Sequence, residues 1–75
     1  MKIIDLHTTE TITDALFLLE QELFHAYQGK ETTCHVIHGI GTGMLARAVH
    51  EALNKNPMVR SWVEAEDGGS CMVTI

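Results

Sequence analysis

The fold is decided by residues 32–55, which read TTCHVIHGIGTGMLARAVHEALNK. Residues 32–37 are mainly β-branched and apolar, a composition that predicts a strand. The glycine-rich turn HGIGTG follows at residues 38–43. Residues 44–55 then carry apolar side chains at helical spacing, which predicts an amphipathic helix. These side chains belong to Leu45, Ala48, Val49, Ala52 and Leu53. A strand that a glycine turn joins to a helix is typical of α/β proteins.

A second strand–helix pair precedes this stretch. Residues 2–7 read KIIDLH, an apolar-rich run that predicts a short strand. Thr11 and Asp14 have the spacing of a helix-capping box, and Gly29 is a good helix stop. Between these signals, apolar residues recur at helical spacing and predict one buried stripe. They are Ile12, Ala15, Leu16, Leu19, Leu23 and Ala26.

Two further strands follow the second helix. Residues 59–65 and residues 71–75 each read as a strand, and the glycine turn at 66–69 predicts that this last pair is antiparallel. The element order is therefore β-α-β-α-β-β. The two strand–helix–strand units imply parallel neighbours with right-handed crossovers. We expect a two-layer α/β sandwich in which both helices cover one face of a mixed four-stranded sheet and leave the other face open.

Length and composition bound the class of protein. The 75 residues fit one domain, residues 1–75, with a small core. With 45% hydrophobic and 20% charged residues, the chain has the composition of a globular rather than a disordered protein. No apolar run approaches the roughly 20 residues that span a bilayer, and the first residues do not read as a signal peptide. We therefore expect a cytoplasmic protein with no membrane partner.

The charge balance is acidic. Five Lys and Arg residues against ten Asp and Glu residues give a formal net charge of -5. This balance argues against strong nonspecific binding to nucleic acid or to an anionic membrane, because both rely on basic charge. It does not exclude a local basic or dipolar site.

The glycine turn at residues 38–43 is the most informative candidate site. Glycines at alternate positions allow tight curvature and close approach of a ligand. The free N–H groups at the start of the following helix favour an anion such as the phosphate of a nucleotide or nucleic acid. The turn lacks the lysine of a P-loop and does not have G-x-G-x-x-G spacing. From spacing alone, a plain connecting turn is an equally good interpretation.

Asp5 and His7 form the second candidate. Strand alternation places both side chains on one face, where a carboxylate and an imidazole could orient each other, act as a base or bind a divalent metal such as magnesium. His38 ends the neighbouring strand, and parallel strands bring their carboxyl ends to one edge of the sheet, where ligands bind in open α/β folds. We therefore expect Asp5, His7, His38 and the glycine turn to form one site.

The other histidines and the cysteines carry weaker signals. His25 and His50 lie off the apolar stripes and are expected to be solvated. His35 belongs either on the open sheet face or in a hydrogen-bonded interior position. Cys34 and Cys71 have no metal-binding CxxC spacing and are too few to staple a small secreted fold, so we expect free thiols in the core.

Trp62 and the methionines complete the candidates. Trp62 could stack on a base or sugar, or it could cover an apolar patch against a loop or partner, and the two interpretations are equally supported. We expect Met44, Met58 and Met72 to fill the core.

The motifs taken together resemble the Smr domain, the small MutS-related domain found at the C-terminus of MutS2-type proteins and also alone. The resemblance rests on Asp5-Leu6-His7, on HGIGTG at residues 38–43, on Leu45-x-x-Ala48-Val49, on Pro57-x-Val59 and on the glycine-rich final strand. It covers essentially the whole chain in the right order. It implies a fold similar to the C-terminal domain of bacterial translation initiation factor three.

The resemblance also implies function. Members bind nucleic acid, several nick DNA or cleave RNA as endonucleases, and some act at stalled ribosomes. Carried onto this chain, the implied catalytic groups are Asp5, His7 and His38. The implied phosphate-binding residues are Gly39, Gly41, Thr42, Gly43 and Arg47. Stabilising charge on a phosphoryl group is the main task in such chemistry.

This sequence departs from the family pattern at several positions. Thr8 stands where the family usually has glycine, and Gly69-Ser70-Cys71 replaces a usual Gly-Ala-Thr run. Ile40 stands where lysine is common. Ala46 stands where arginine is common, with Arg47 next to it. The loss of two phosphate-seeking cations predicts weaker binding and a salt dependence lower by about two units of slope.

Three functions therefore remain as hypotheses. The first is an endonuclease that hydrolyses phosphodiester bonds in DNA or RNA. The second is a noncatalytic module that holds a phosphate of nucleic acid or of a nucleotide in the same loop. The third is an interaction protein, a homodimer that joins through the open sheet face and buries Trp62.

Overall fold

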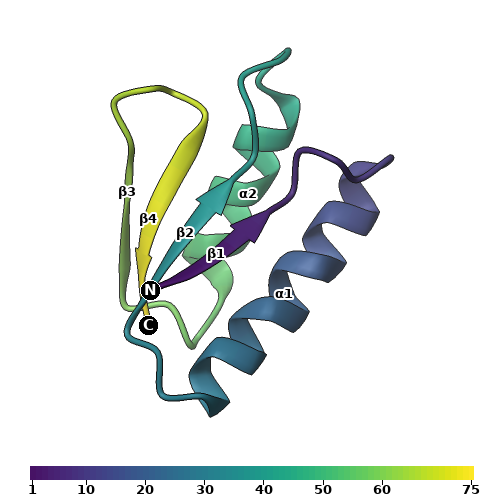
Figure 1. The fold of residues 1–75 in the computed structure, drawn as a ribbon. Coiled ribbons are helices and arrows are strands. Elements are labelled where there is room, and N and C mark those ends of the chain that lie inside the picture. Colours follow the sequence, from purple (N-terminus) through teal and green to yellow (C-terminus); the bar gives the residue numbers. More distant parts are fainter.

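Strands and helices alternate along the chain in the predicted order, β-α-β-α-β-β (Figure 1). The computed structural model describes residues 1–75. The elements are β1 Lys2–Asp5, α1 Ile12–Gln28, β2 Thr33–Ile37, α2 Met44–Lys55, β3 Ser61–Glu64 and β4 Ser70–Thr74. Both helices pack on the same face of the sheet, so the two-layer sandwich expected from the sequence is confirmed (Figure 1).

The sheet has the strand order β1-β2-β4-β3. β1 and β2 are parallel, and β4 runs antiparallel to both β2 and β3. The prediction of parallel neighbours is correct for β1 and β2. It is wrong for β2 and β3, which run in the same direction but are not neighbours, because β4 lies between them. The apolar centre of β4, at residues 71–73, suits a central strand, whereas the polar β3 suits an exposed edge.

Helix α1 begins and ends where the sequence predicts. The Thr11 hydroxyl accepts a hydrogen bond of 3.0 Å from the backbone N–H of Asp14, which confirms Thr11 as the N-cap. At the other end, the N–H of Gly29 donates to the carbonyls of the last turn. Four residues of the apolar stripe are fully buried against the sheet: Ala15, Leu19, Leu23 and Ala26.

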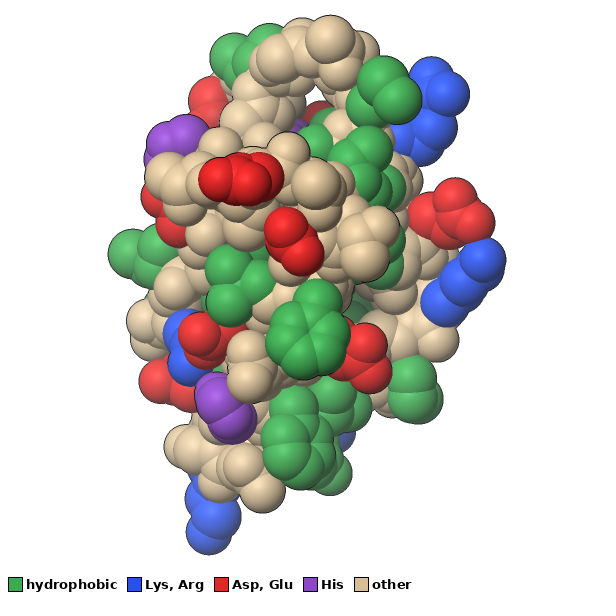
Figure 2. Space-filling model, turned by 90° about the vertical axis from the view of Figure 1, so that its right-hand side faces the viewer, with side chains coloured by type: hydrophobic (Ala, Val, Ile, Leu, Met, Phe, Trp, Pro, Cys, Tyr) green, Lys and Arg blue, Asp and Glu red, His purple; other side chains and the backbone are tan.

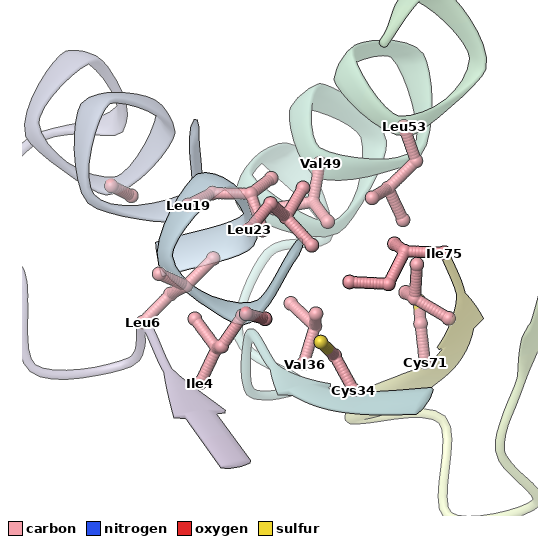
Figure 3. Close-up of a cluster of buried hydrophobic side chains, with 13 residues drawn as sticks. Ile4, Leu6, Leu19, Leu23, Cys34, Val36, Val49, Leu53, Cys71 and Ile75 are labelled. Atoms are coloured by element: carbon pink, nitrogen blue, oxygen red, sulfur yellow. The ribbon is translucent and has the colours of Figure 1, made fainter. Parts of the chain in front are cut away.

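The core lies between the sheet and the two helices. Figure 3 shows strand side chains such as Ile4 and Val36 directed toward Leu19 and Leu23 of α1 and toward Val49 of α2. The two cysteines are free and completely buried, as expected for small core residues. They are Cys34 and Cys71. No helix of the chain is both long enough and apolar enough to cross a membrane.

The opposite face of the sheet carries no helix. The strand register aligns Ile3, His35, Met72 and Val63 in one row across it. Ile3 and Val63 are strongly exposed, and His35 and Met72 are half-buried. His35 therefore belongs to the open face, which decides between its two predicted positions.

The methionine predictions are confirmed for one residue only. Met58 packs against the core, as expected. Met72 instead faces outward, in the row on the open side of the sheet. Met44 is 64% exposed, because it is the first residue of α2 and lies before the apolar stripe reaches the core.

Candidate functional site

The loop at residues 38–43 is curved by three glycines in left-handed backbone conformations. Their φ angles are 82° at Gly39, 41° at Gly41 and 84° at Gly43, a region that residues with a Cβ rarely adopt. The base of the loop is fixed by the turn before β4, since the carbonyl of Gly69 accepts hydrogen bonds from the N–H groups of His38 (3.1 Å) and Gly39 (2.9 Å).

The outer part of the loop presents free backbone donors. None of the four successive N–H groups of residues 40–43 finds a backbone acceptor, and the loop is exposed to solvent. Gly43 is the N-cap of α2 and supplies no side-chain cap, and the first turn of α2 has no acidic residue. A long hydrogen bond of 3.4 Å from the N–H of Met44 to the Thr42 hydroxyl is the side-chain contact at this end. No acidic side chain offsets the positive end of the helix dipole, and this favours an anion at the loop.

A hollow of about 390 Å³ lies at this loop. It is lined by His7, His38, Gly39, Ile40, Gly41, Thr42, Gly43 and Leu45. The register that pairs Asp5 with Ile37 brings the ends of β1 and β2 together, and a Cβ built on Gly39 would lie 3.4 Å from the Cβ of His7. Most of the predicted site residues therefore meet at the predicted edge of the sheet.

Asp5 and His7 form a hydrogen-bonded pair on the solvent side of β1. The ring Nδ1 and the backbone N–H of His7 both donate to Oδ1 of Asp5. The hydrogen bond from the imidazole, followed by that from the backbone, holds the pKa of Asp5 below its usual value. With Nδ1–H engaged by the carboxylate, the neutral ring carries its lone pair on Nε2. The pair can therefore act as an oriented base.

His38 lies inside the loop rather than on its surface. Its side chain is buried at 3% exposure, and its Nδ1 donates to the carbonyl of Gly39 at 2.7 Å. Nε2 of the same ring is buried and has no hydrogen-bond partner. His38 thus borders the hollow, and its imidazole holds the loop from within.

The prediction that His50 is solvated is wrong. Its ring stacks on Trp62, with centroids 4.5 Å apart and planes inclined by 19°, and meets the edge of His38 at 5.5 Å. Its Nε2 is buried without a partner. The face of α2 that carries His50 also covers β3, a contact that helical periodicity alone did not reveal. His25, by contrast, is exposed as expected.

Trp62 packs within the molecule. Its indole is half-buried against the core, stacks on His50 and donates from Nε1 to Oδ1 of Asn54 at 2.8 Å. Of the two interpretations from the sequence, these contacts favour the covering of an apolar patch over stacking on a base. The patch belongs to α2 of the same chain.

Basic charge near the loop is sparse. Arg47 lies exposed in the first turn of α2, forms no ion pair and does not line the hollow. Ile40 is 71% exposed at the rim. Figure 2 shows the side of the molecule that carries α1, where acidic side chains are distributed over the surface. The basic and dipolar features of the site are thus confined to the loop and the start of α2.

The protein offers a magnesium ion at the hollow one carboxylate, that of Asp5. Magnesium prefers an octahedron of oxygen ligands, with one or two carboxylates among them. Asp5 is the carboxylate next to the hollow, and its Oδ1 is already occupied by His7. A second group of potential metal ligands, at most 4.8 Å from one another, is formed by His38, His50 and Cys71 behind the loop.

Sequence reasoning missed two residues that shape the site. Gly69 is buried, and its carbonyl fixes both His38 and Gly39. Asp67 supports this position, because its Oδ1 accepts from the N–H of Gly69 at 2.8 Å and from the hydroxyl of Ser70 at 3.3 Å. An aspartate two residues before a glycine is a recognisable turn signal, but the signal does not say which loop the turn will support.

Comparisons with known proteins find relatives of this chain. A family model described as the Smr domain matches residues 4–75. The endonuclease MutS2 of Aquifex aeolicus is 41% identical over 59 residues, which cover 76% of this chain and 8% of that protein. The endonuclease MutS2 of Thermus thermophilus is 36% identical over 58 residues, which cover 77% and 8%. This chain therefore spans less than a tenth of the length of these relatives.

A solved structure is also similar. The crystal structure of the Smr domain of Thermus thermophilus MutS2 superposes with a TM-score of 0.91 at 33% sequence identity. The superposition covers 99% of this chain and 96% of that one.

Proposed function

Because the chain belongs to the Smr domain family, we propose that it binds nucleic acid at the loop of residues 38–43 and cleaves phosphodiester bonds there as an endonuclease. The observation that carries this proposal is the meeting of four unpaired amides, at residues 40–43, with the Asp5–His7 pair at one edge of the sheet. Two relatives are known as endonuclease MutS2, which supports the same class of reaction.

Phosphate binding is the first step. The free amides of residues 40–43 and the N-terminus of α2 face an anion with fixed partial charges. Thr42 adds a hydroxyl at the loop, and Arg47 adds one unpaired cation nearby. These groups would hold the scissile phosphate and stabilise the charge that develops on its oxygens during the reaction.

Proton transfer is the second step. Nε2 of His7 accepts the proton of the attacking hydroxyl, which is a water or, in RNA, a ribose 2′-hydroxyl. The attacking oxygen forms a bond to phosphorus, and the bond to the leaving oxygen breaks as that oxygen takes a proton from solvent. Asp5 orients the imidazole and stabilises its protonated form. His38 acts through the loop, as a positioning residue bonded to Gly39.

A noncatalytic binding module is the second candidate function. It is favoured by the net charge of -5 and by exposed Ile40 at the rim, which leave few cations to hold the substrate during turnover. This module would use the same amides and would not need His7.

A cleavage and binding assay separates the two candidates. Supercoiled plasmid and a labelled RNA hairpin are incubated at low salt with and without magnesium. We expect His7→Gln and Asp5→Asn to lower the rate of cleavage by about 10²- to 10⁴-fold and to leave binding unchanged. His25→Gln, an exposed histidine on α1, is the matched control. Binding without cleavage by the wild-type chain establishes the noncatalytic module, and no binding overturns both candidates.

The glycine loop is tested in the same assay. Gly41→Ala places a Cβ at a φ of 41° and should lower the affinity by disturbing the amides. Gly29→Ala adds the same methyl group at the C-cap of α1, where φ is -80° and no residue lines the hollow, and it should leave binding unchanged. Equal losses in the two variants would show that the loop conformation is irrelevant to binding.

A further inference from the structure

We propose that His38, His50 and Cys71 bind a zinc ion behind the loop of residues 38–43. One potential ligand atom from each side chain lies within 4.8 Å of the other two. This cluster shares His38 with the lining of the hollow, but its other two residues lie outside the hollow, and the inference does not depend on nuclease activity.

Three elements that are distant in sequence bring these side chains together. His38 follows the end of β2, His50 lies in the middle of α2, and Cys71 is the second residue of β4. In the sheet, Cys71 pairs with Val36, two residues before His38. The cluster therefore lies at the junction of the central strands and α2, on the side of the sheet that carries the core.

The hydrogen bond of His38 prepares it as a ligand. A carbonyl oxygen only accepts, so the ring nitrogen Nδ1 that faces the carbonyl of Gly39 carries the proton. The lone pair is then on Nε2, which is buried and has no partner. Metal-bound histidines commonly donate their other ring N–H to a backbone carbonyl in this way.

His50 shows the same unused nitrogen. Its Nε2 is also buried without a partner, and the two histidines provide both of the orphaned buried side-chain atoms in the molecule. Stacking on Trp62 limits rotation of the His50 ring, and the hydrogen bond from Trp62 to Asn54 fixes the indole in turn. Buried polar atoms are almost always paired, so two neighbouring exceptions point to a shared ligand.

The donor set matches zinc. Two imidazole nitrogens and one thiolate sulfur are ligands that zinc takes in proteins, with about 2.0–2.1 Å to nitrogen and about 2.3 Å to sulfur. Tetrahedral geometry at these bond lengths separates the ligand atoms by about 3.3–3.6 Å, so the cluster needs a contraction of about 1 Å. The three side chains supply three of the four ligands that zinc takes, as in protein sites where a water completes the tetrahedron.

Zinc binding would also change the state of Cys71. Burial, followed by the nearby Glu64 carboxylate, raises the pKa of this thiol to about 11, so Cys71 is a neutral thiol at pH 7 when no metal is bound. Zinc forms a bond to Sγ as the sulfur–hydrogen bond breaks, and the proton leaves to solvent. The thiolate then offsets one of the two positive charges of the zinc ion.

The test uses the whole chain stripped with EDTA and then titrated with zinc or cobalt. We expect one zinc per chain by mass spectrometry of the metal after desalting. Cobalt should produce visible d–d bands and a near-ultraviolet thiolate-to-cobalt band, which report the sulfur ligand directly. Free zinc at a hundredfold excess over its dissociation constant should raise the midpoint of thermal unfolding by roughly 15 °C.

Three variants locate the site. Cys71→Ser and His50→Gln should lose stoichiometric zinc, and Cys71→Ser should also lose the thiolate band. Cys34→Ser is the matched control, because Cys34 is equally buried and lies outside the cluster. Circular dichroism checks that each variant is folded. Of the two ligands tested, His50 should tolerate substitution better than Cys71, because it is only half-buried. The proposal is overturned if the wild-type chain binds no stoichiometric zinc, or if Cys34→Ser loses as much zinc as Cys71→Ser.

Discussion

At the scale of single residues, the two histidines next to Gly39, His7 and His38, have different surroundings. His7 lies on the solvent side, bonded to a carboxylate, and its Nε2 is free to accept a proton. His38 lies on the inner side, bonded to the carbonyl of Gly39, and its Nε2 faces the interior. Chemistry that requires contact with solvent is therefore available to His7, and structural or metal-binding roles are available to His38.

Ile40 provides the prediction at this scale. It is 71% exposed at the rim of the hollow, so Ile40→Lys adds a cation next to the free amides without disturbing the core. We expect tighter binding of RNA or DNA at low salt and a plot of log affinity against log salt that is steeper by about 0.7 to 0.9. Fluorescence anisotropy across a salt series measures both quantities.

Phe17→Lys is the control for this change. Phe17 is 69% exposed on α1, away from the loop, and its replacement adds the same charge to the chain. If both variants gain the same affinity, the effect comes from net charge, and the loop is not the binding site.

Strand alternation explains which residues of the site could be predicted. It places Ile4 and Leu6 inside and Asp5 and His7 outside, and both placements are confirmed. His38 belongs to an irregular loop, where no period fixes the direction of a side chain, and its burial was therefore not foreseen. His50 was missed because its partner, Trp62, lies on a strand that only the tertiary fold brings under α2.

At the scale of elements, α2 contributes in two ways. Its N-terminus directs unpaired amides and an uncompensated dipole toward the hollow. Its middle turn carries His50 toward β4 and Trp62. A change in the position of this helix would therefore alter the proposed phosphate site and the proposed zinc site together.

The contact between β1 and α1 provides the prediction at this scale. Lys2 Nζ lies 2.7 Å from Glu22 Oε2, and this interaction lowers the pKa of Glu22 from its usual 4.5. Because the folded-state pKa is lowered, the pair stabilises the fold above pH 4.5, and this contribution is lost as the pH falls through the folded-state value. Glu22→Gln should lower the free energy of unfolding by about 0.5 kcal/mol at neutral pH.

Urea denaturation at pH 7 and at pH 3 measures this effect. The wild-type chain and Glu22→Gln should differ at pH 7 in low salt and converge at pH 3 or in 1 M salt, where the pair is screened. Glu20→Gln is the control. It removes an exposed carboxylate of the same helix that has no ion-pair partner, so it should change the free energy of unfolding little at either pH. A Glu22→Gln deficit that persists at pH 3 contradicts the ion-pair explanation.

The elements themselves were predictable because each carries its own local signal, such as Thr11 and Gly29 around α1. The position of β4 was not. A tight turn before residue 70 predicts that β3 and β4 pair, but it does not say that β4 will also pair with β2. Strand order depends on which strand best fills the centre of the sheet, which is a property of the assembled core.

At the scale of the whole molecule, the core is small and includes two cysteines. Cys34 and Cys71 are both completely buried, and burial raises the pKa of each thiol. Because the folded-state pKa of Cys71 is raised, this thiol leaves the free energy of unfolding unchanged at pH values below its usual pKa of 9.0. As the pH rises toward about 11, the free energy of unfolding falls, because the unfolded chain loses its thiol proton first.

Global unfolding of Cys71→Ala tests this linkage. In EDTA, we expect the wild-type chain to lose about 2 kcal/mol more stability than Cys71→Ala between pH 8 and pH 11, since each pKa unit corresponds to about 1.4 kcal/mol. Val73→Ala, an equally buried position on β4, should be destabilised by the same amount at every pH. Parallel curves for the wild-type chain and Cys71→Ala would refute the assignment.

The central place of β4 has a consequence for how the chain reaches its native state. β4 follows every other element in sequence, yet it forms the seam between β2 and β3. During synthesis on the ribosome, β1, α1 and β2 can assemble early, but the sheet cannot close until the last strand emerges. Until then, β2 has an unpaired edge that could pair with another nascent chain. Correct folding therefore depends on how soon residues 70–74 arrive.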